Sequence, residues 1–259
     1  MLPHFSIKAL YPLALAEGEG VGTAYEYYAK RQALARWLTT LSAPRSLLIA
    51  GLPEKYGSSL DFLQLAQDLG VTRPVIVDDR ADALRKASQS VSAARKTGAL
   101  RDVHPEYVEV DKLNALDELN GEFDLCLGSE VLQRIGNGAR AEYLSRLCGL
   151  APAVGLFAPN GENRSHTTLS GLSGIGLAEV CALARACGLL VQSGYVDMPP
   201  FPPGLTRSSA QRAKAAAGRL EALAMATLGC YARLERGLPR GWRRTHAHIV
   251  YGFVESPQR

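Results

Sequence analysis

The sequence predicts an α/β protein built on an open, doubly wound sheet. Seven short apolar runs of strand length are spread along the 259 residues, and segments with helical periodicity separate most of them. Strands that alternate with helices pair in parallel through right-handed crossovers, which places helices on both faces of the sheet. The chain is long enough for a large buried core. Its 47% hydrophobic and 21% charged residues are typical of a globular protein and exclude disorder for most of the chain.

The predicted strands and helices follow one another in a regular order. The strands are expected at 46–50, 74–78, 107–110, 123–127, 154–158, 189–193 and 248–254. Two of them, starting near Leu47 and Val75, are almost continuously apolar, as expected of central strands buried on both faces. Between the first six strands, helical patterns run over 59–69, 82–95, 140–150 and 178–187.

Two further helices fall outside this alternation. Residues 22–42 form an amphipathic leading helix, and residues 208–236 form a long helix with a capping box that starts at Ser208. The periodicity of the long helix predicts a buried face that includes Leu223, Leu228 and Leu234. Four prolines between 199 and 203 favour a stiff connector before it, although a ligand for an SH3-type groove is an alternative.

These patterns divide the chain into four predicted parts. Residues 1–42 are a helical segment or lid, 43–197 a cofactor-binding core, 198–245 a proline-rich connector with a helical insertion, and 246–259 the final strand of the core. The arginines and lysines cluster between 207 and 244, outside the core.

Charge, cysteines and hydropathy exclude several classes of protein. The 29 basic and 25 acidic residues give a net charge of +4, too little to predict a nucleic-acid partner. The five cysteines form no CxxC pair and lack a histidine set for zinc, so we expect reduced thiols, no metal and a cytoplasmic location. No apolar stretch reaches the ~18 residues of a membrane helix, and no secretory signal is recognisable. The oligomeric state stays open, a homodimer included.

Candidate ligand-binding residues follow the predicted strands, because open α/β sheets bind ligands beyond the carboxyl ends of their strands. A loop with glycine at both ends, from Gly51 to Gly57, follows the first strand; it matches neither a phosphate-binding P-loop nor the GxGxxG fingerprint. Asp78 and Asp79 end the second strand and predict either a ribose contact or a helix cap. The remaining strand ends carry further polar or turn-forming residues: Asp111, Lys112, Gly128, Ser129, Glu130 and Asn160.

Taken together, these segments resemble the class I S-adenosylmethionine-dependent methyltransferases, and most closely the type 11-like enzymes that act on small molecules. The most specific part is Phe123 to Ile135, which is similar to the family pattern of Phe-Asp, an apolar strand, and then Ser-Glu-Val-Leu. The resemblance covers about residues 45–195. It implies a Rossmann-like sheet of seven strands whose last strand is antiparallel.

The resemblance also implies roles for individual residues. Asp78, with Asp79 beside it, would bind the ribose of S-adenosylmethionine. Asp111, followed by Lys112, would bind the adenine amino group, and Gly128 and Ser129 would line the sulfonium side. The loop from Gly51 to Gly57, with Leu52, would cradle the methionine part. The family's acidic residue and later glycines are missing from this loop, where Ile49, Pro53 and Lys55 stand instead. Glu54 is a candidate to replace the missing carboxylate.

The acceptor is predicted only as a small molecule, methylated at an oxygen, nitrogen, sulfur or carbon atom. His166 is the candidate general base, although a packing role fits a histidine in such a loop equally well. Tyr25, Tyr28, Glu130 and Asn160 are the candidate acceptor-binding residues. The altered first loop supports an alternative, a non-catalytic methyltransferase-like binding or scaffold protein. A nicotinamide-dependent oxidoreductase is disfavoured by the missing GxGxxG.

Overall fold

The computed structural model describes residues 5–55, 57–114, 116, 119, 122–200, 219–235 and 237–256. Seven strands form a single mixed sheet in the order β3-β2-β1-β4-β5-β7-β6. All neighbours pair in parallel except β7, which runs antiparallel to both β5 and β6. The strands are Ser46–Ala50 (β1), Arg73–Asp78 (β2), Glu106–Glu109 (β3), Leu125–Ser129 (β4), Ala153–Pro159 (β5), Leu189–Val196 (β6) and Ile249–Glu255 (β7). The predicted fold class and antiparallel last strand are confirmed.

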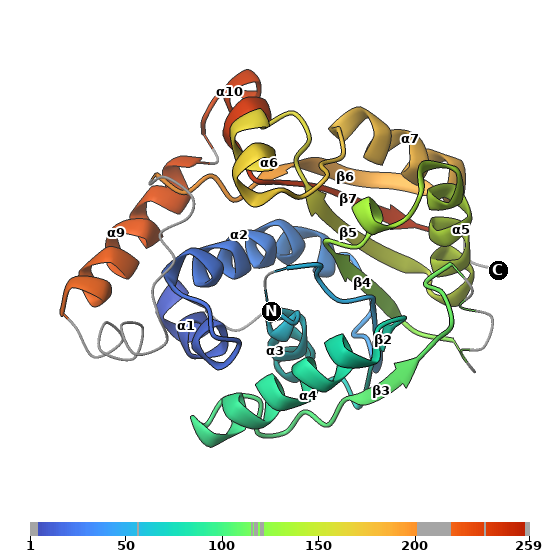
Figure 1. The fold of residues 1–259 in the computed structure, drawn as a ribbon, viewed down its shortest axis with the longest axis horizontal. Coiled ribbons are helices and arrows are strands. Elements are labelled where there is room, and N and C mark those ends of the chain that lie inside the picture. The colour runs from blue at the N-terminus through green and yellow to red at the C-terminus, as the bar shows by residue number, and fades with distance from the viewer. Residues whose placement is uncertain are drawn as a thin grey trace.

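Helices cover both faces of this sheet (Figure 1). One face packs against α1 (Ile7–Ala16), α2 (Val21–Leu38), α3 (Leu60–Leu69) and α4 (Ala81–Lys96), and the other against α5 (Arg140–Leu150) and α7 (Leu177–Cys187). The alternation along β1 shows why there are two cores. Leu47 and Ile49 belong to the first cluster, Leu48 and Ala50 to the second, and all four are fully buried.

Two differences from the sequence prediction have clear causes. Residues 1–42 were expected to be a helical segment, but a helix was assigned only to 22–42, and the structure adds α1, which contains Pro12. The helix forms around the proline, with Ser6 capping its start and Leu10 and Leu13 buried. The fourth strand starts two residues later than predicted, because the Asp124 carboxylate turns back to accept hydrogen bonds from the backbone of Arg45 and Ser46.

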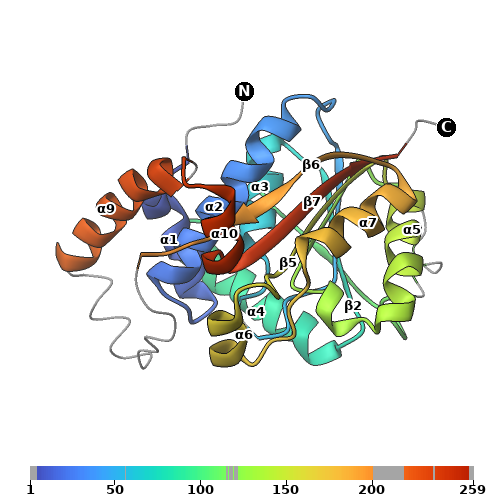
Figure 2. The ribbon, with the colours of Figure 1, turned by 90° about the horizontal axis from the view of Figure 1, so that it is seen from above.

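The helical insertion is described from α9 (Arg219–Glu235) onward, followed by the short helix α10 (Arg240–His246). The predicted cap at Ser208 and residues 201–204 of the proline-rich stretch lie outside the described residues. The helix α9 lies beside α1 and α2 (Figure 2) and buries Met225, Leu228 and Ala232. The predicted buried face was wrong for Leu223 and Leu234, which are 61% and 69% exposed, because α9 docks through the neighbouring face.

Within the described residues, no helix has both the length and the apolar character needed to cross a membrane.

Candidate functional site

The candidate site lies along the edge of the sheet where β1, β2, β4, β5 and β6 end and β7 begins. Backbone hydrogen bonds continue the sheet past the strands there. Asn160 N donates to His248 O at 2.7 Å, and His248 N donates to Asp197 O at 2.7 Å. Asn160, His248 and Asp197, which adjoin β5, β7 and β6 respectively, therefore lie side by side. The same edge carries Gly51, Asp78, Ser129 and Glu130.

Asp78 at the end of β2 is fully buried, and the chain itself supplies its partners. Its Oδ2 accepts from Leu52 N at 2.7 Å and from Arg134 Nη1 at 2.9 Å. Its Oδ1 accepts from Arg80 N at 3.0 Å and from Arg80 Nε at 2.8 Å. Burial acts to raise the pKa of Asp78, but the hydrogen bonds from Arg80 and Arg134 hold it below its usual range. The Asp78 carboxylate is therefore ionised, and the two arginines already balance its negative charge.

The same two arginines fasten the first loop to the end of β2. Arg134 donates to Leu52 O at 2.9 Å and pairs with Asp79, and Arg80 donates to Leu52 O at 2.9 Å and to Pro53 O at 3.1 Å. Further along the loop, Lys55 Nζ donates to Ser170 O, at the end of helix α6 (Arg164–Ser170). The loop therefore spans the edge of the sheet from β2 to α6.

The glycines of this loop face the chain's own side chains. Gly51 has φ +82°, and a Cβ there would lie 2.8 Å from a methyl group of Val131. Gly57 has φ +75°, and a Cβ there would lie 2.9 Å from the hydroxyl of Tyr27. Glu54, the candidate replacement for the family's carboxylate, accepts a long hydrogen bond of 3.5 Å from Gln133 Nε2. Side-chain packing at both glycines explains why the loop needs them.

The other predicted cofactor-binding residues occupy two environments. Asp111 and Lys112, after β3, are exposed. Gly128 lies inside β4 at the contact with β1, where a Cβ would lie 3.3 Å from Ala50 O. Ser129 is fully buried, and its Oγ accepts from Lys30 Nζ at 3.3 Å.

Lys30, on α2, joins the leading helices to this edge. It is 1% exposed and pairs with Glu26 at 3.0 Å and with Asp61, at the start of α3, at 3.1 Å. Burial acts to lower the pKa of Lys30, but the charges of Asp61 and Glu26 hold it above its ordinary value. The lysine is therefore a fixed positive charge under the ends of β1 and β4.

Glu130, the residue after β4, is buried in a strained backbone conformation with φ +55°. Burial and the nearby negative charge of Glu26 raise its pKa to about 8, although Lys30 opposes this. Its Oε2 is inaccessible to solvent and has no hydrogen-bond partner. A buried acceptor without a partner costs stability, so this oxygen is a place where a ligand donor would be favourable.

Asp197 and two histidines complete the edge beyond β6 and β7. Asp197 is 5% exposed with φ +64°; one of its oxygens lies 3.0 Å from His248 Nδ1 and the other, Oδ1, has no partner. Asp197 raises the pKa of His248 against the opposing effect of burial. His166, on α6, stacks on His248 with ring centroids 4.1 Å apart, and burial and His248 lower its pKa to about 4.

The candidate acceptor-binding residues Tyr25, Tyr28 and Asn160 differ in how far the chain already uses them. Tyr25 is fully buried and donates to the Glu235 carboxylate. Asn160 donates to Arg244 O and Ala247 O, both at 2.8 Å, and accepts from Glu162 N. Tyr28 lines a cavity.

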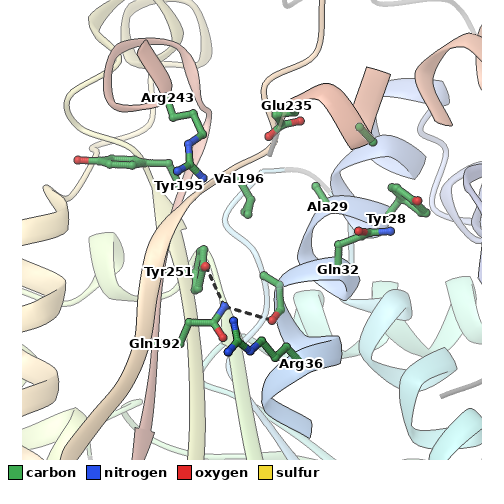
Figure 3. A pocket seen from close by; sticks show the side chains of 12 residues that line it. Tyr28, Ala29, Gln32, Arg36, Gln192, Tyr195, Val196, Glu235, Arg243 and Tyr251 are labelled. Atoms are coloured by element: carbon green, nitrogen blue, oxygen red, sulfur yellow. Dashed lines mark hydrogen bonds between the residues drawn. The ribbon is translucent and has the colours of Figure 1, made fainter. Parts of the chain in front are cut away.

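This cavity of about 240 Å³ lies between α2, α9, β6 and β7. Glu235 and Arg243 lie toward one end, and Gln192, Tyr251 and Arg36 toward the other (Figure 3). Ala29, Ala33 and Val196 contribute apolar wall. Val196 directly precedes Asp197, so the cavity adjoins the edge of the sheet where Glu130 and Asp197 lie.

Comparison with known proteins shows what fold this is. No protein-family model matches the sequence, and no curated protein matches it. Among solved structures, the plantazolicin methyltransferase BpumL in complex with S-adenosylhomocysteine aligns with a TM-score of 0.54 over 97% of this chain and 98% of its own, at 12% identity.

Two other solved methyltransferases align over most of their length, each at 12% identity. Magnesium protoporphyrin IX methyltransferase (ChlM) from Synechocystis PCC 6803, with bound S-adenosylhomocysteine, aligns with a TM-score of 0.53 over 90% of this chain and 84% of its own. The N-methyltransferase NodS from Bradyrhizobium japonicum WM9, in complex with S-adenosylhomocysteine, aligns with a TM-score of 0.51 over 88% and 86%. The chain has the class I methyltransferase fold. The resemblance read from the sequence is confirmed at this level, and S-adenosylmethionine is the cofactor of the fold.

Several residues at this edge of the sheet were not predicted from the sequence as site residues. Asp197 could have been found by the rule that located Asp78, because it directly follows β6. His248 precedes β7 and lies beside Asp197 because β6 and β7 are antiparallel. Lys30 and Arg134 carried no such signal, since a basic residue in a helix or turn is usually solvated. Among the described residues, no cluster of histidine, cysteine and acidic side chains has metal-binding geometry.

Proposed function

We propose that this chain is an S-adenosylmethionine-dependent methyltransferase that acts on a small molecule in the cytoplasm. The observation that carries the proposal is the methyltransferase strand order with Asp78 and Asp111 beyond the neighbouring strands β2 and β3. All five cysteines are free, which suits a reducing compartment.

The chemistry of the acidic residues fits the cofactor. Carboxylates such as those of Asp78 and Asp79 accept hydrogen bonds from ribose hydroxyls, and the exposed Asp111 is free to accept from an adenine amino group. Asp78 now binds Arg80 and Arg134, so a ribose has to take the place of Arg134 at Asp78 Oδ2. The fit therefore requires a movement of this arginine.

When bound, S-adenosylmethionine supplies a methyl group that is already activated for in-line displacement. The chain has to orient the acceptor and keep water out. We assign the exclusion of water to residues 1–42 as a lid, to the loop from Gly51 to Gly57, and to the insertion within 198–245. In support, α1, α2 and α9 pack together beside the site, and Lys55 ties the loop to α6.

Isothermal titration calorimetry with S-adenosylhomocysteine tests the proposal. We expect binding, and we expect Asp78→Asn to weaken it at least tenfold, because the variant loses a charged acceptor. Asp102→Asn is the matched control, since this exposed residue lies far from the edge with the site. Failure of the wild-type protein to bind at millimolar ligand contradicts the proposal.

The arrangement of Asp78 also favours a second candidate, a non-catalytic methyltransferase-like scaffold. A ribose-binding carboxylate that is fully buried and bound to two arginines is what a disused cofactor site would contain. Arg134→Gln separates the two functions. If neither the wild-type protein nor this variant binds S-adenosylhomocysteine, the scaffold function is supported; if either binds, it is contradicted.

A further inference from the structure

Four carboxylates, from α2, the start of α3 and the ends of β4 and β6, form a buried cluster in which carboxylates outnumber the cations of the described residues. We call Glu26, Asp61, Glu130 and Asp197 the acidic cluster. The side chains of Asp61, Glu130 and Asp197 are at least nine-tenths buried, and that of Glu26 is 18% exposed. Two cations of the described residues lie among them, Lys30 and, when protonated, His248. Fully ionised, the acidic cluster would therefore retain a negative charge.

The orphaned oxygens of the acidic cluster are a second and independent observation. Asp61 Oδ1, Glu130 Oε2 and Asp197 Oδ1 are all inaccessible to solvent, and none has a hydrogen-bond partner among the described residues. They come from three elements, the start of α3 and the ends of β4 and β6. Lys30 joins three members of the cluster, because it pairs with Glu26 and Asp61 and donates to Ser129, the residue before Glu130. The charge of Asp197 also raises the pKa of Glu130. Buried acceptors left open in this way are typical of a place that a donor fills on binding.

Metal-binding geometry is absent from the acidic cluster, as from the rest of the described chain. An organic ammonium group fits it better, because it brings one positive charge and two or three N–H donors. We propose that the acidic cluster binds the ammonium group of an amine, and that this amine is the methyl acceptor. The acceptor assignment rests on the proposed methyltransferase function.

The position of the cluster separates it from the predicted ribose and adenine contacts of the cofactor. Asp78 and Asp111 follow β2 and β3 on one side of β1, whereas Glu130 and Asp197 follow β4 and β6 on the other. Glu235, which lines the cavity of Figure 3, lies close enough to Asp197 for their charges to interact, and the cavity has room for the uncharged body of an amine.

Methyl transfer to this amine needs no reactant besides the amine and S-adenosylmethionine. The ammonium group transfers one proton to the Glu130 carboxylate, which frees the nitrogen lone pair. The new N–C bond forms as the C–S bond breaks, and the electron pair of that bond stays on sulfur as the neutral thioether. Glu130 suits this step, because burial and the charge of Glu26 favour its protonated form.

Calorimetric titration with three amines and their alcohols tests the ammonium preference. The probes are n-hexylamine, 2-phenylethylamine and tyramine, with 1-hexanol, 2-phenylethanol and tyrosol as neutral counterparts. We expect at least one amine to bind at least about tenfold more tightly than its alcohol. If no amine does so, the proposal is overturned even when S-adenosylhomocysteine binds normally. Amine binding without S-adenosylhomocysteine binding would instead contradict the proposed methyltransferase function and support the ammonium site.

Two variants identify the residues, with Glu142→Gln on the exposed side of α5 as control. We expect Glu130→Gln and Asp197→Asn to weaken amine binding at least about tenfold and to leave S-adenosylhomocysteine binding within about twofold. Asparagine suits position 197 because it tolerates a positive φ. If both variants lose S-adenosylhomocysteine and keep the amine, the carboxylates hold the cofactor and the acceptor assignment is wrong.

Proton linkage gives a readout in the wild-type protein that needs no variant to fold. The groups facing Glu130 are Glu26, Lys30, Glu54 and Asp197, and its raised pKa keeps it largely protonated at neutral pH. An arriving ammonium favours the carboxylate, so amine binding should release a proton and tighten from about pH 6 to 8. Titrations in buffers of different ionisation enthalpy measure this release. Its absence overturns the role of Glu130.

Discussion

The two halves of the site differ in how their carboxylates are paired. Beyond β2, Asp78 accepts hydrogen bonds from two arginines and from the backbone, and no oxygen is left open. Beyond β4 and β6, Glu130 and Asp197 each retain a buried oxygen without a partner. A paired carboxylate contributes to stability and must give up a partner to bind a ligand, whereas an unpaired one costs stability until a ligand arrives. Removing the charge of a paired carboxylate should therefore lower the stability of the protein, whereas removing the charge of an unpaired one should raise it.

The largest effect is expected from Asp78→Asn. The change removes the fully buried charge that Arg80 and Arg134 share and leaves Asp79 as the remaining acidic partner of Arg134. Breaking a buried pair in this way costs about 3 kcal/mol of the free energy of unfolding. Urea denaturation measures the loss, and Asp102→Asn is the exposed control. A loss below about 1 kcal/mol would show that the arginines find other partners and that the paired half is not held by Asp78.

A smaller effect of the opposite sign is expected for ligand binding to Arg134→Gln. This variant removes one of two guanidinium groups that donate to Asp78 Oδ2, while Arg80 still pairs with Oδ1 and donates to Oδ2 at 3.2 Å. We expect S-adenosylhomocysteine to bind about three- to tenfold more tightly, because its ribose no longer has to displace a charged donor. Arg146→Gln on α5, where the arginine pairs with the exposed Glu142, is the control. Weaker binding by Arg134→Gln would mean that this arginine contacts the ligand directly.

Glu130, in the unpaired half, should change how the free energy of unfolding depends on pH. The pKa of Glu130 is raised to about 8, so the folded protein keeps a proton that the unfolded chain, with its ordinary pKa, has lost. Stability contributed by this group is present at low pH and lost as pH rises toward 8. Glu130→Gln removes that loss, which makes the slope of unfolding free energy against pH shallower by up to about 1.4 kcal/mol per unit. Glu142→Gln should leave the slope unchanged.

Glu17 should also make the free energy of unfolding fall as pH rises, so a Glu17 variant is measured beside the Glu130 variant. Its buried carboxylate accepts from Ser58 N at 2.5 Å at the start of α3, and burial raises its pKa to about 8. Glu17→Gln should also make the slope shallower, and the double variant with Glu130→Gln should make it shallower still. Equal slopes in the wild type and the double variant would contradict the ionisation behaviour assigned to both groups.

The sheet could be predicted from the sequence because each strand depends mainly on its own residues. The apolar runs at Leu47 and Val75 mark buried strands wherever they occur, and every strand was found to within a few residues of its ends. Within the predicted helical segment 1–42, α1 was not assigned as a separate helix; it contains Pro12, and burial of Leu10 and Leu13 against neighbouring elements stabilises it.

The site could be predicted only where the position of a residue in its strand determines its location. Asp78, Ser129 and Glu130 follow from strand ends, but their partners do not. Arg134 reaches Asp78 across 56 residues through the turn after β4, and Lys30 reaches Asp61 from another helix. Such pairings depend on how helices and turns dock onto the sheet. The exposed Leu223 and Leu234 of α9 illustrate the same limit, because periodicity alone does not say which face a helix buries against its neighbours.

The smallest expected effect concerns the cavity that adjoins the unpaired half. Ala29, on α2, lines it, and Ala29→Phe would fill part of its roughly 240 Å³. If the uncharged body of an amine lies there, the variant should weaken 2-phenylethylamine binding by about three- to tenfold, because lost apolar contact costs about 1 kcal/mol. Methylamine, which has almost no body, should bind the variant and the wild type alike. Equal losses for both amines would mean that the phenylalanine disturbs the acidic cluster, and no loss for either would mean that the acceptor enters by another route.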